Sequence, residues 1–94
     1  MNIRSKTMTN IPSLPGAYIL ENSGRPIYIG STENLFRRIN EWRNNPENPC
    51  VRRMGFDNVS YRATSGLEEA RRLELHWFNH FRPVCNLATP PGTA

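Results

Sequence analysis

Lysine is almost absent from this chain, since Lys6 is the only one among 94 residues. The two cysteines, Cys50 and Cys85, form no CxxC pair, which argues against a structural zinc site. We expect both to be reduced thiols near the core of a cytoplasmic protein. No long apolar run is present, so the sequence predicts neither a signal peptide nor a membrane span, and no membrane partner.

The positive charge that is present comes from arginine. Lys and Arg number 12 against 8 Asp and Glu, and the pI is near 9.7. A basic balance favours a polyanionic partner such as nucleic acid, and the planar guanidinium suits phosphate. The length allows one domain. We predict it over residues 11–87, after a polar N-terminal extension at 1–10 and before a flexible Pro- and Gly-bearing C-terminal tail at 88–94.

Three short segments are predicted to be strands. Gly16–Leu20 and Pro26–Gly30 flank the turn signal Asn22-Ser23-Gly24, so they form a β-hairpin. Val59–Ala63 alternates apolar and polar residues, as a half-buried strand does. Together with the helices below, they predict an α+β fold: a small three-stranded antiparallel sheet flanked by helices.

A first helix is predicted to follow an N-cap at Ser31 or Thr32 and to end near Asn44, and Cys50–Met54 is predicted to be a short helix. On the first helix an apolar stripe faces the core. Arg38 flanks this stripe, whereas the neighbouring Arg37 points to solvent. If either arginine is held at a site, Arg38 is the better candidate, although two solvated charges are the simpler interpretation.

A second long helix is predicted over Leu67–Phe81, opened by a capping box of Ser65 and Glu68. Glu74 falls in the middle of its apolar face, which comprises Leu67, Ala70, Leu73, Trp77, Phe78 and Phe81. A carboxylate there is costly without a compensating cation or hydrogen bond. Two interpretations stand: a salt bridge with an arginine or a side chain that reaches the rim, and a ligand for a divalent metal.

Five elements in order carry a resemblance to a known family. They are Gly16-Ala17-Tyr18, Tyr28-Ile29-Gly30, an arginine at Arg38, a glutamate at Glu74, and a closing Pro-x-x-Asn at 83–86. The chain resembles the GIY-YIG nuclease family over about residues 11–87, with alanine in place of the first isoleucine. Each triplet alone would be a weak pattern, because strand tyrosines are usually packing residues.

The resemblance implies a metal-dependent endonuclease that hydrolyses DNA phosphodiester bonds. Glu74 would hold one divalent ion, Mg²⁺ or Mn²⁺, and Arg38 would stabilise charge on the phosphoryl group. Tyr18 would accept a proton from the attacking water, with Tyr28 orienting that water or sharing the role. The motif glycines are Gly16 and Gly30, and the latter would let the backbone approach the site.

Two further residues and a group of arginines bear on this pattern. Asn86 either ties the C-terminal segment to the backbone or contacts the substrate. Trp42 stands where some family members carry a histidine, which leaves a tyrosine as the candidate base. Further arginines are candidates for DNA backbone contacts, although surface charge is the simpler interpretation of each one; they are Arg37, Arg43, Arg52, Arg53, Arg71 and Arg72.

Several alternatives stay open. One is a non-catalytic nucleic-acid-binding module on the same fold, and another is a small interaction domain in which Glu74 pairs with Arg38. The substrate of a nuclease also stays open: duplex, single-stranded or branched DNA, or RNA. A small domain fits structure-selective or single-strand-selective cutting, and a protein partner that supplies targeting.

Overall fold

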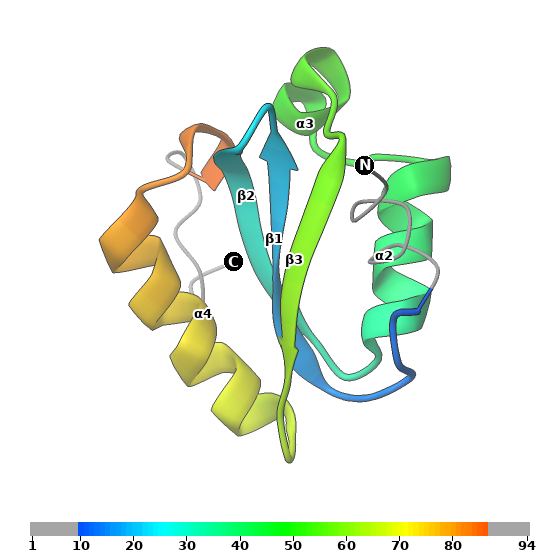
Figure 1. The fold of residues 1–94 in the computed structure, drawn as a ribbon, viewed down its shortest axis with the longest axis vertical. Coiled ribbons are helices and arrows are strands. Elements are labelled where there is room, and N and C mark those ends of the chain that lie inside the picture. Colours follow the sequence, from blue (N-terminus) through cyan, green and yellow to red (C-terminus); the bar gives the residue numbers. More distant parts are fainter. Residues whose placement is uncertain (1–9, 87–94) are drawn as a thin grey trace.

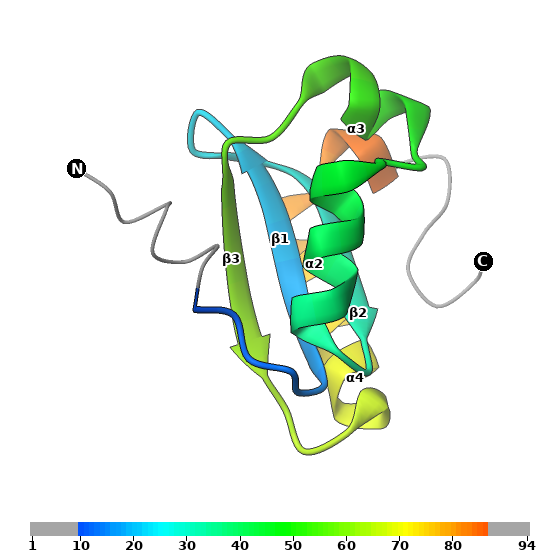
Figure 2. The ribbon, with the colours of Figure 1, turned by 90° about the vertical axis from the view of Figure 1, so that its right-hand side faces the viewer.

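The computed structural model describes residues 10–86; apart from Asn10, the predicted N-terminal extension and C-terminal tail lie outside the described residues. A three-stranded sheet forms the centre, with helix α2 (Leu35–Asn44) over one face and helix α4 (Leu67–Phe81) over the other (Figures 1 and 2). The short helix α3 (Pro49–Met54) lies beyond one end of the sheet, and a 3-10 turn, η1 (Val84–Asn86), follows α4. The predicted α+β fold is confirmed.

The hairpin consists of β1 (Gly16–Asn22) and β2 (Arg25–Thr32). Ser23 and Gly24 form its turn with φ angles of 53° and 81°. Two consecutive positive φ angles are the signature of a tight hairpin turn whose twist matches that of the strands. The predicted turn is therefore confirmed, but both strands are two or three residues longer than the sequence indicated.

The third strand, β3 (Asn58–Ala63), pairs with β1, which gives the antiparallel order β2-β1-β3. Tyr18 on β1 lies opposite Gly30 on β2. Because side chains alternate along a strand, Tyr18 and Tyr28 point to the α2 face, whereas Ser31 points to the α4 face. The edge strand β2 thus presents different candidate residues on its two sides.

Helix α2 begins later than the sequence predicted. Its N-cap is Asn34, whose side chain accepts a hydrogen bond from the Arg37 amide at 3.0 Å. The predicted cap at Ser31 or Thr32 is wrong because both residues continue β2. Thr32 instead accepts a hydrogen bond from the Asn34 amide at 3.1 Å and so shapes the turn from strand to helix.

Helix α4 has the predicted bounds but a different cap. Gly66 occupies the N-cap position and makes no side-chain bond. Ser65 bonds to Glu69, at 2.9 Å through its amide and 2.7 Å through its hydroxyl, so the predicted pairing with Glu68 is wrong. The glutamate that reaches back stands at the third helical position, as in a capping box, but that position falls one residue later than expected.

The core lies mainly between the sheet and α2. Its largest buried side chains in the described chain include Tyr18, Leu20, Leu35 and Ile39. The opposite side is thinner, because α4 buries only Ala70 and Glu74 there, and Phe81 is 42% exposed. The predicted continuous apolar face of α4 is therefore only partly buried, which leaves the Glu74 carboxylate close to a surface.

The expectation of two reduced thiols is contradicted. Cys50 on α3 and Cys85 on η1 form a disulfide with a Cα–Cα distance of 5.4 Å. The two residues are 35 positions apart, so spacing alone gave no sign of the pairing. Among the described residues, no helix has both the length and the apolar character needed to cross a bilayer.

Candidate active site

Tyr18 and Tyr28 come together on adjacent strands of the hairpin. Their ring centroids lie 6.5 Å apart on the α2 face of the sheet. Tyr18 is 1% exposed, and a Cβ atom added at Gly30 would collide with its hydroxyl group. Gly30 is therefore a strand residue whose missing side chain makes room for Tyr18. Gly16 likewise makes room for the Arg62 carbonyl on β3 and for the Leu35 side chain.

Trp42, on α2, contacts three of the predicted site residues. Its indole N–H donates a hydrogen bond of 2.8 Å to the hydroxyl oxygen of Tyr18. Its ring centroid lies 4.8 Å from that of Tyr28, and the Arg38 guanidinium lies over it at 5.0 Å. Because Trp42 is 3% exposed, it supports the side chains of Tyr18, Tyr28 and Arg38 from the core.

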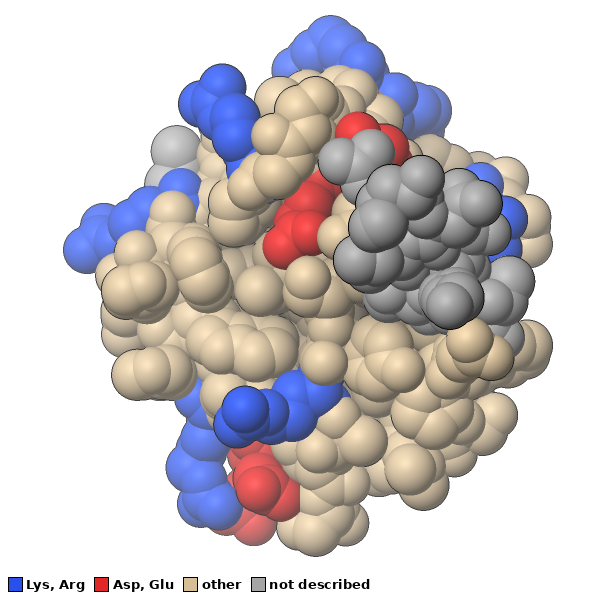
Figure 3. Space-filling view, viewed as in Figure 1, with Lys and Arg blue, Asp and Glu red and all other residues tan. Residues whose placement is uncertain are grey.

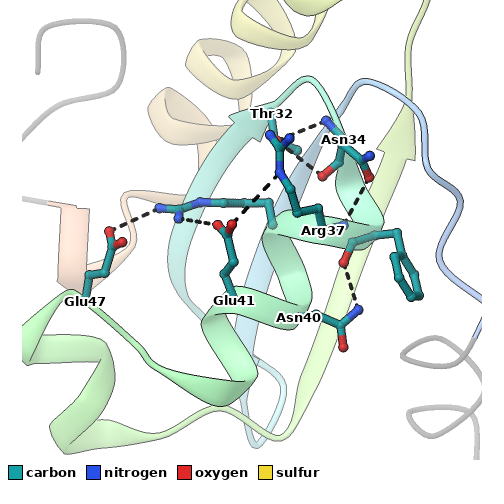
Figure 4. Close-up of polar contacts among 8 residues, drawn as sticks. Thr32, Asn34, Arg37, Asn40, Glu41 and Glu47 are labelled. Atoms are coloured by element: carbon teal, nitrogen blue, oxygen red, sulfur yellow. Dashed lines mark hydrogen bonds and ion pairs between the residues drawn. The ribbon is translucent and has the colours of Figure 1, made fainter.

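Arg38 is held at the surface of this cluster by two carboxylates (Figure 4). Its guanidinium lies 3.0 Å from Glu41, one turn along α2, and 3.6 Å from Glu47, in the loop after the helix. The Arg38 side chain is 26% exposed, whereas that of Arg37 is 61% exposed. The predicted contrast between a flanking Arg38 and a solvent-facing Arg37 is confirmed.

The two tyrosines differ in their surroundings. Burial raises the pKa of Tyr18 far above its usual range, and the neighbouring Tyr28 raises it further, against smaller opposing effects of Trp42 and Arg38. Burial also raises the pKa of Tyr28, but Arg38 opposes that shift most strongly. Tyr28 is only partly buried. Tyr18 is therefore a protonated buried phenol, and Tyr28 is the tyrosine of the pair that solvent can reach.

Glu74 lies on the other face of β2, where α4 packs on the sheet. It is 8% exposed, and its Oε1 atom accepts a hydrogen bond of 2.5 Å from the hydroxyl of Ser31. Burial raises the pKa of Glu74, although the Ser31 hydrogen bond and the charge of Arg71 lower it. Within residues 10–86 it forms no ion pair, and its Oε2 atom has no hydrogen-bond donor. The expected alternative, a salt bridge to Arg38, is not formed.

The two groups of residues meet around β2. Tyr28 and Ser31 are three positions apart on this strand, and the Glu74 carboxylate raises the pKa of Tyr28. The described residues contain no cluster of three or more His, Cys, Asp or Glu side chains suited to a metal. A hard cation at this site would therefore use the Glu74 carboxylate together with water or substrate oxygens, which is how Mg²⁺ is commonly held.

Asn86 secures the strand that carries Tyr28. Its Oδ1 atom accepts from the Ile29 amide at 2.7 Å, and its Nδ2 atom donates to the Ile29 carbonyl at 3.0 Å. Asn86 is 2% exposed, so both groups are paired away from water. Of the two expectations for Asn86, a backbone tie and a substrate contact, this geometry provides the tie.

The six arginines predicted to contact DNA do not form one patch. Arg72 lies 3.8 Å from Glu68 on α4, and Arg52 donates to the Pro46 carbonyl at 3.2 Å. On the face in Figure 3, Lys and Arg atoms lie in separate groups divided by uncharged surface. Arg71 is the one whose charge reaches Glu74 and lowers its pKa. The remaining exposed ones are distributed over α2 and α3: Arg37, Arg43 and Arg53.

Two residues gained importance only in three dimensions. Ser31 had been expected to cap a helix, yet it donates to Glu74. Trp42 had been noted as a departure at a histidine position, yet it contacts Tyr18, Tyr28 and Arg38. The sequence held one indication of this role for Ser31. It directly follows the Tyr28-Ile29-Gly30 triplet, so a strand that continued through it would point its side chain to the face opposite Tyr28.

Comparisons with known proteins agree with this geometry. A family model described as the GIY-YIG catalytic domain matches residues 14–87. The chain is 34% identical over 87 residues to the UvrABC system protein C of Thermotoga maritima and 31% identical over 81 residues to that of Aquifex aeolicus. These matches cover 90% and 83% of this chain, but only 15% and 14% of those longer proteins.

A solved structure has the same fold. It is the GIY-YIG N-terminal endonuclease domain of UvrC from Thermotoga maritima, bound to magnesium as its catalytic divalent cation. The TM-score is 0.75 at 31% sequence identity, and the match covers 93% of this chain and 99% of that one.

Proposed function

The chain belongs to the GIY-YIG family and has the fold of its endonuclease domain, and from this premise we propose that it is a metal-dependent endonuclease that hydrolyses DNA phosphodiester bonds. One observation carries the proposal beyond the fold. Within residues 10–86, the nearly buried Glu74 carboxylate has one oxygen without a hydrogen-bond donor, and it lies near the cluster that contains Tyr28 and Arg38. A fold retained only for binding would not need a buried carboxylate that has one hydrogen bond and no ion pair within residues 10–86.

The residues present fit a single divalent cation, Mg²⁺ or Mn²⁺. Glu74 supplies hard carboxylate oxygen, and its Oε2 atom has no competing protein donor among residues 10–86. When bound, such a cation polarises a phosphate oxygen and stabilises the leaving 3′ oxygen. The burial that raises the pKa of Glu74 is also what a nearby cation would offset.

The other site residues act on the phosphate and the attacking water. Arg38 stabilises the charge that develops on the phosphoryl group. Tyr28 accepts the proton of the attacking water, because it is partly exposed and because Arg38 favours its phenolate form. Tyr18, at 1% exposure, is a better hydrogen-bonding partner than a base. This reverses the order of roles that the resemblance suggested for the two tyrosines.

The proposed partner is DNA, which the arginines would contact through its backbone. The relatives named above are components of the UvrABC system, and this chain spans about a seventh of their length. We therefore include in the proposal that a protein partner supplies targeting. We also include selectivity for single-stranded or branched DNA. Arg71 is the arginine best placed for a contact near the scissile phosphate, since its charge already acts on Glu74. Backbone contacts of this kind make activity fall as salt rises.

The contact on which the alternative interaction-domain hypothesis depends is not formed. It required Glu74 to pair with Arg38, whereas Arg38 pairs with Glu41 and Glu47. A non-catalytic binding module would tolerate a broken set of site residues, but the tyrosines, the arginine and the glutamate are all present. We also propose a cytoplasmic location, where a nuclease would meet its DNA; the Cys50–Cys85 disulfide is unusual for that compartment.

Cleavage assays test the nuclease. Labelled single-stranded, duplex, branched DNA and RNA are incubated with Mg²⁺, Mn²⁺ or EDTA, with wild type, Glu74→Ala and the matched control Glu68→Ala, which alters an exposed carboxylate of the same helix. We expect metal-dependent cutting of DNA by wild type and by the control, and none by Glu74→Ala. If folded wild type cuts no substrate with either metal, the activity proposed for this domain alone is wrong, and binding to the same substrates would favour the non-catalytic module.

A further inference from the structure

Ser31 makes the one hydrogen bond to the Glu74 side chain within the described residues. The donor is the Ser31 hydroxyl on β2, and the acceptor is Oε1 of Glu74 on α4, at 2.5 Å. The serine sits on a paired strand, opposite Ala17, so its backbone cannot move without disturbing the sheet. A hydrogen bond from such a rigid donor holds the carboxylate in one orientation.

A second serine–glutamate pair in the same sheet shows what a purely structural version looks like. Glu21 accepts from Ser60 at 3.0 Å through Oε2 and from Asn58 at 2.7 Å through Oε1. Both of its oxygens are therefore satisfied by protein donors. Glu74 differs because, within residues 10–86, only its Oε1 atom has a protein donor, although it is the one buried charged residue there. The Ser31 bond occupies one oxygen and leaves the other available.

We propose that Ser31 is the positioning residue for the metal-binding carboxylate, an inference that rests on the proposed function. The hydroxyl fixes the Glu74 side chain and keeps Oε2 free as the ligand atom. A carboxylate that is already ordered loses less conformational freedom when a cation binds. Groups that hydrogen-bond to a metal ligand typically affect metal affinity or activity by about 10- to 100-fold.

The experiment measures metal binding directly, apart from catalysis. Mn²⁺ alone is titrated into each protein, and free Mn²⁺ is followed by electron paramagnetic resonance. We expect Ser31→Ala to weaken Mn²⁺ binding about tenfold or more and Ser31→Thr, which keeps the hydroxyl and suits a strand, to stay close to wild type. Ser60→Ala is the matched control, because it removes the same kind of bond from Glu21 and leaves Glu74 unaffected.

Cleavage as a function of Mn²⁺ concentration gives a second readout. A positioning role predicts that Ser31→Ala needs more metal for half-maximal activity and recovers most of its rate at saturating metal. Circular dichroism checks that each variant is folded; if Ser31→Ala is not, Ser31→Cys, which keeps the volume but donates weakly, replaces it.

The outcomes separate this inference from the proposed function. If wild type binds Mn²⁺ and cuts DNA while folded Ser31→Ala matches it at every metal concentration, the positioning role is wrong and the nuclease stands. Equal losses in Ser31→Ala and Ser31→Thr would also overturn the role, because the hydroxyl would not be the relevant group. If wild type neither binds Mn²⁺ nor cuts, the proposed function fails and the inference falls with it.

Discussion

Replacing Glu74 with glutamine should remove the activity and leave the protein at least as stable. Gln has nearly the same shape and can still accept the Ser31 hydrogen bond, so the contact at Oε1 persists. What disappears is the charge, which is disfavoured in the fold because burial raises the pKa of Glu74. Each unit of elevation corresponds to about 1.4 kcal/mol of folding free energy lost at neutral pH.

The pH dependence follows from the direction of that shift. Between the ordinary value of 4.5 and the raised pKa, the folded state holds the Glu74 proton more tightly than the unfolded chain does. Stability of the wild type therefore falls as pH rises through this window, and it falls no further above the folded pKa. Glu74→Gln does not lose stability in this way, so its gain in unfolding free energy over wild type should be smallest near pH 4 and largest near pH 7.

Thermal unfolding in EDTA from pH 4 to pH 8 measures this difference. A gain of about 1 kcal/mol would raise the melting temperature by roughly 4–8 °C for a domain of this size. Glu68→Gln is the control, since it removes a charge from the same helix at a side chain that is 89% exposed. If Glu74→Gln were instead destabilised by more than about 1 kcal/mol at pH 7, the carboxylate would be compensated within the protein, and the argument for a metal ligand would fail.

Three further perturbations test the scaffold of the site. Trp42→Phe should cost about 1–3 kcal/mol of stability and lower kcat, because Tyr18 loses its buried hydrogen-bond donor and Arg38 loses part of its contact with an aromatic ring. Chemical denaturation measures the stability and cleavage rates measure kcat. An unchanged cleavage rate would show that Trp42 does not support the site. Asn86→Ala should cost about 2 kcal/mol and speed hydrogen exchange at the Ile29 amide, whereas unchanged exchange would show that the amide finds another acceptor. Reducing the disulfide with dithiothreitol should lower the free energy of unfolding by up to about 3–4 kcal/mol, since the bond closes a loop of 35 residues. Denaturant unfolding with and without the reductant measures this loss. Two free thiols in the untreated protein, with no effect of the reductant, would contradict the pairing.

The sequence alone identified the features that depend on local chemistry. Ser23 and Gly24 form the predicted turn because a hairpin of this length needs positive φ angles there. The bounds of α4 followed from apolar spacing and from Pro83 after its end. Glu74 stood out because a carboxylate in the middle of an apolar helix face needs a reason, and the structure does bury it.

Other features depended on segments far apart in the chain, and these the sequence could not provide. A single misplaced boundary made Ser31 a helix cap, although it lies on β2 and its hydroxyl reaches α4, 43 positions later. The register of β2 against β1 decides that Ser31 faces α4 while Tyr28 faces α2, since successive strand residues point to opposite sides. The disulfide and the Asn86 tie likewise join distant positions. Local sequence thus determined which residues are unusual, and only the pairing of strands and helices decided which of them meet.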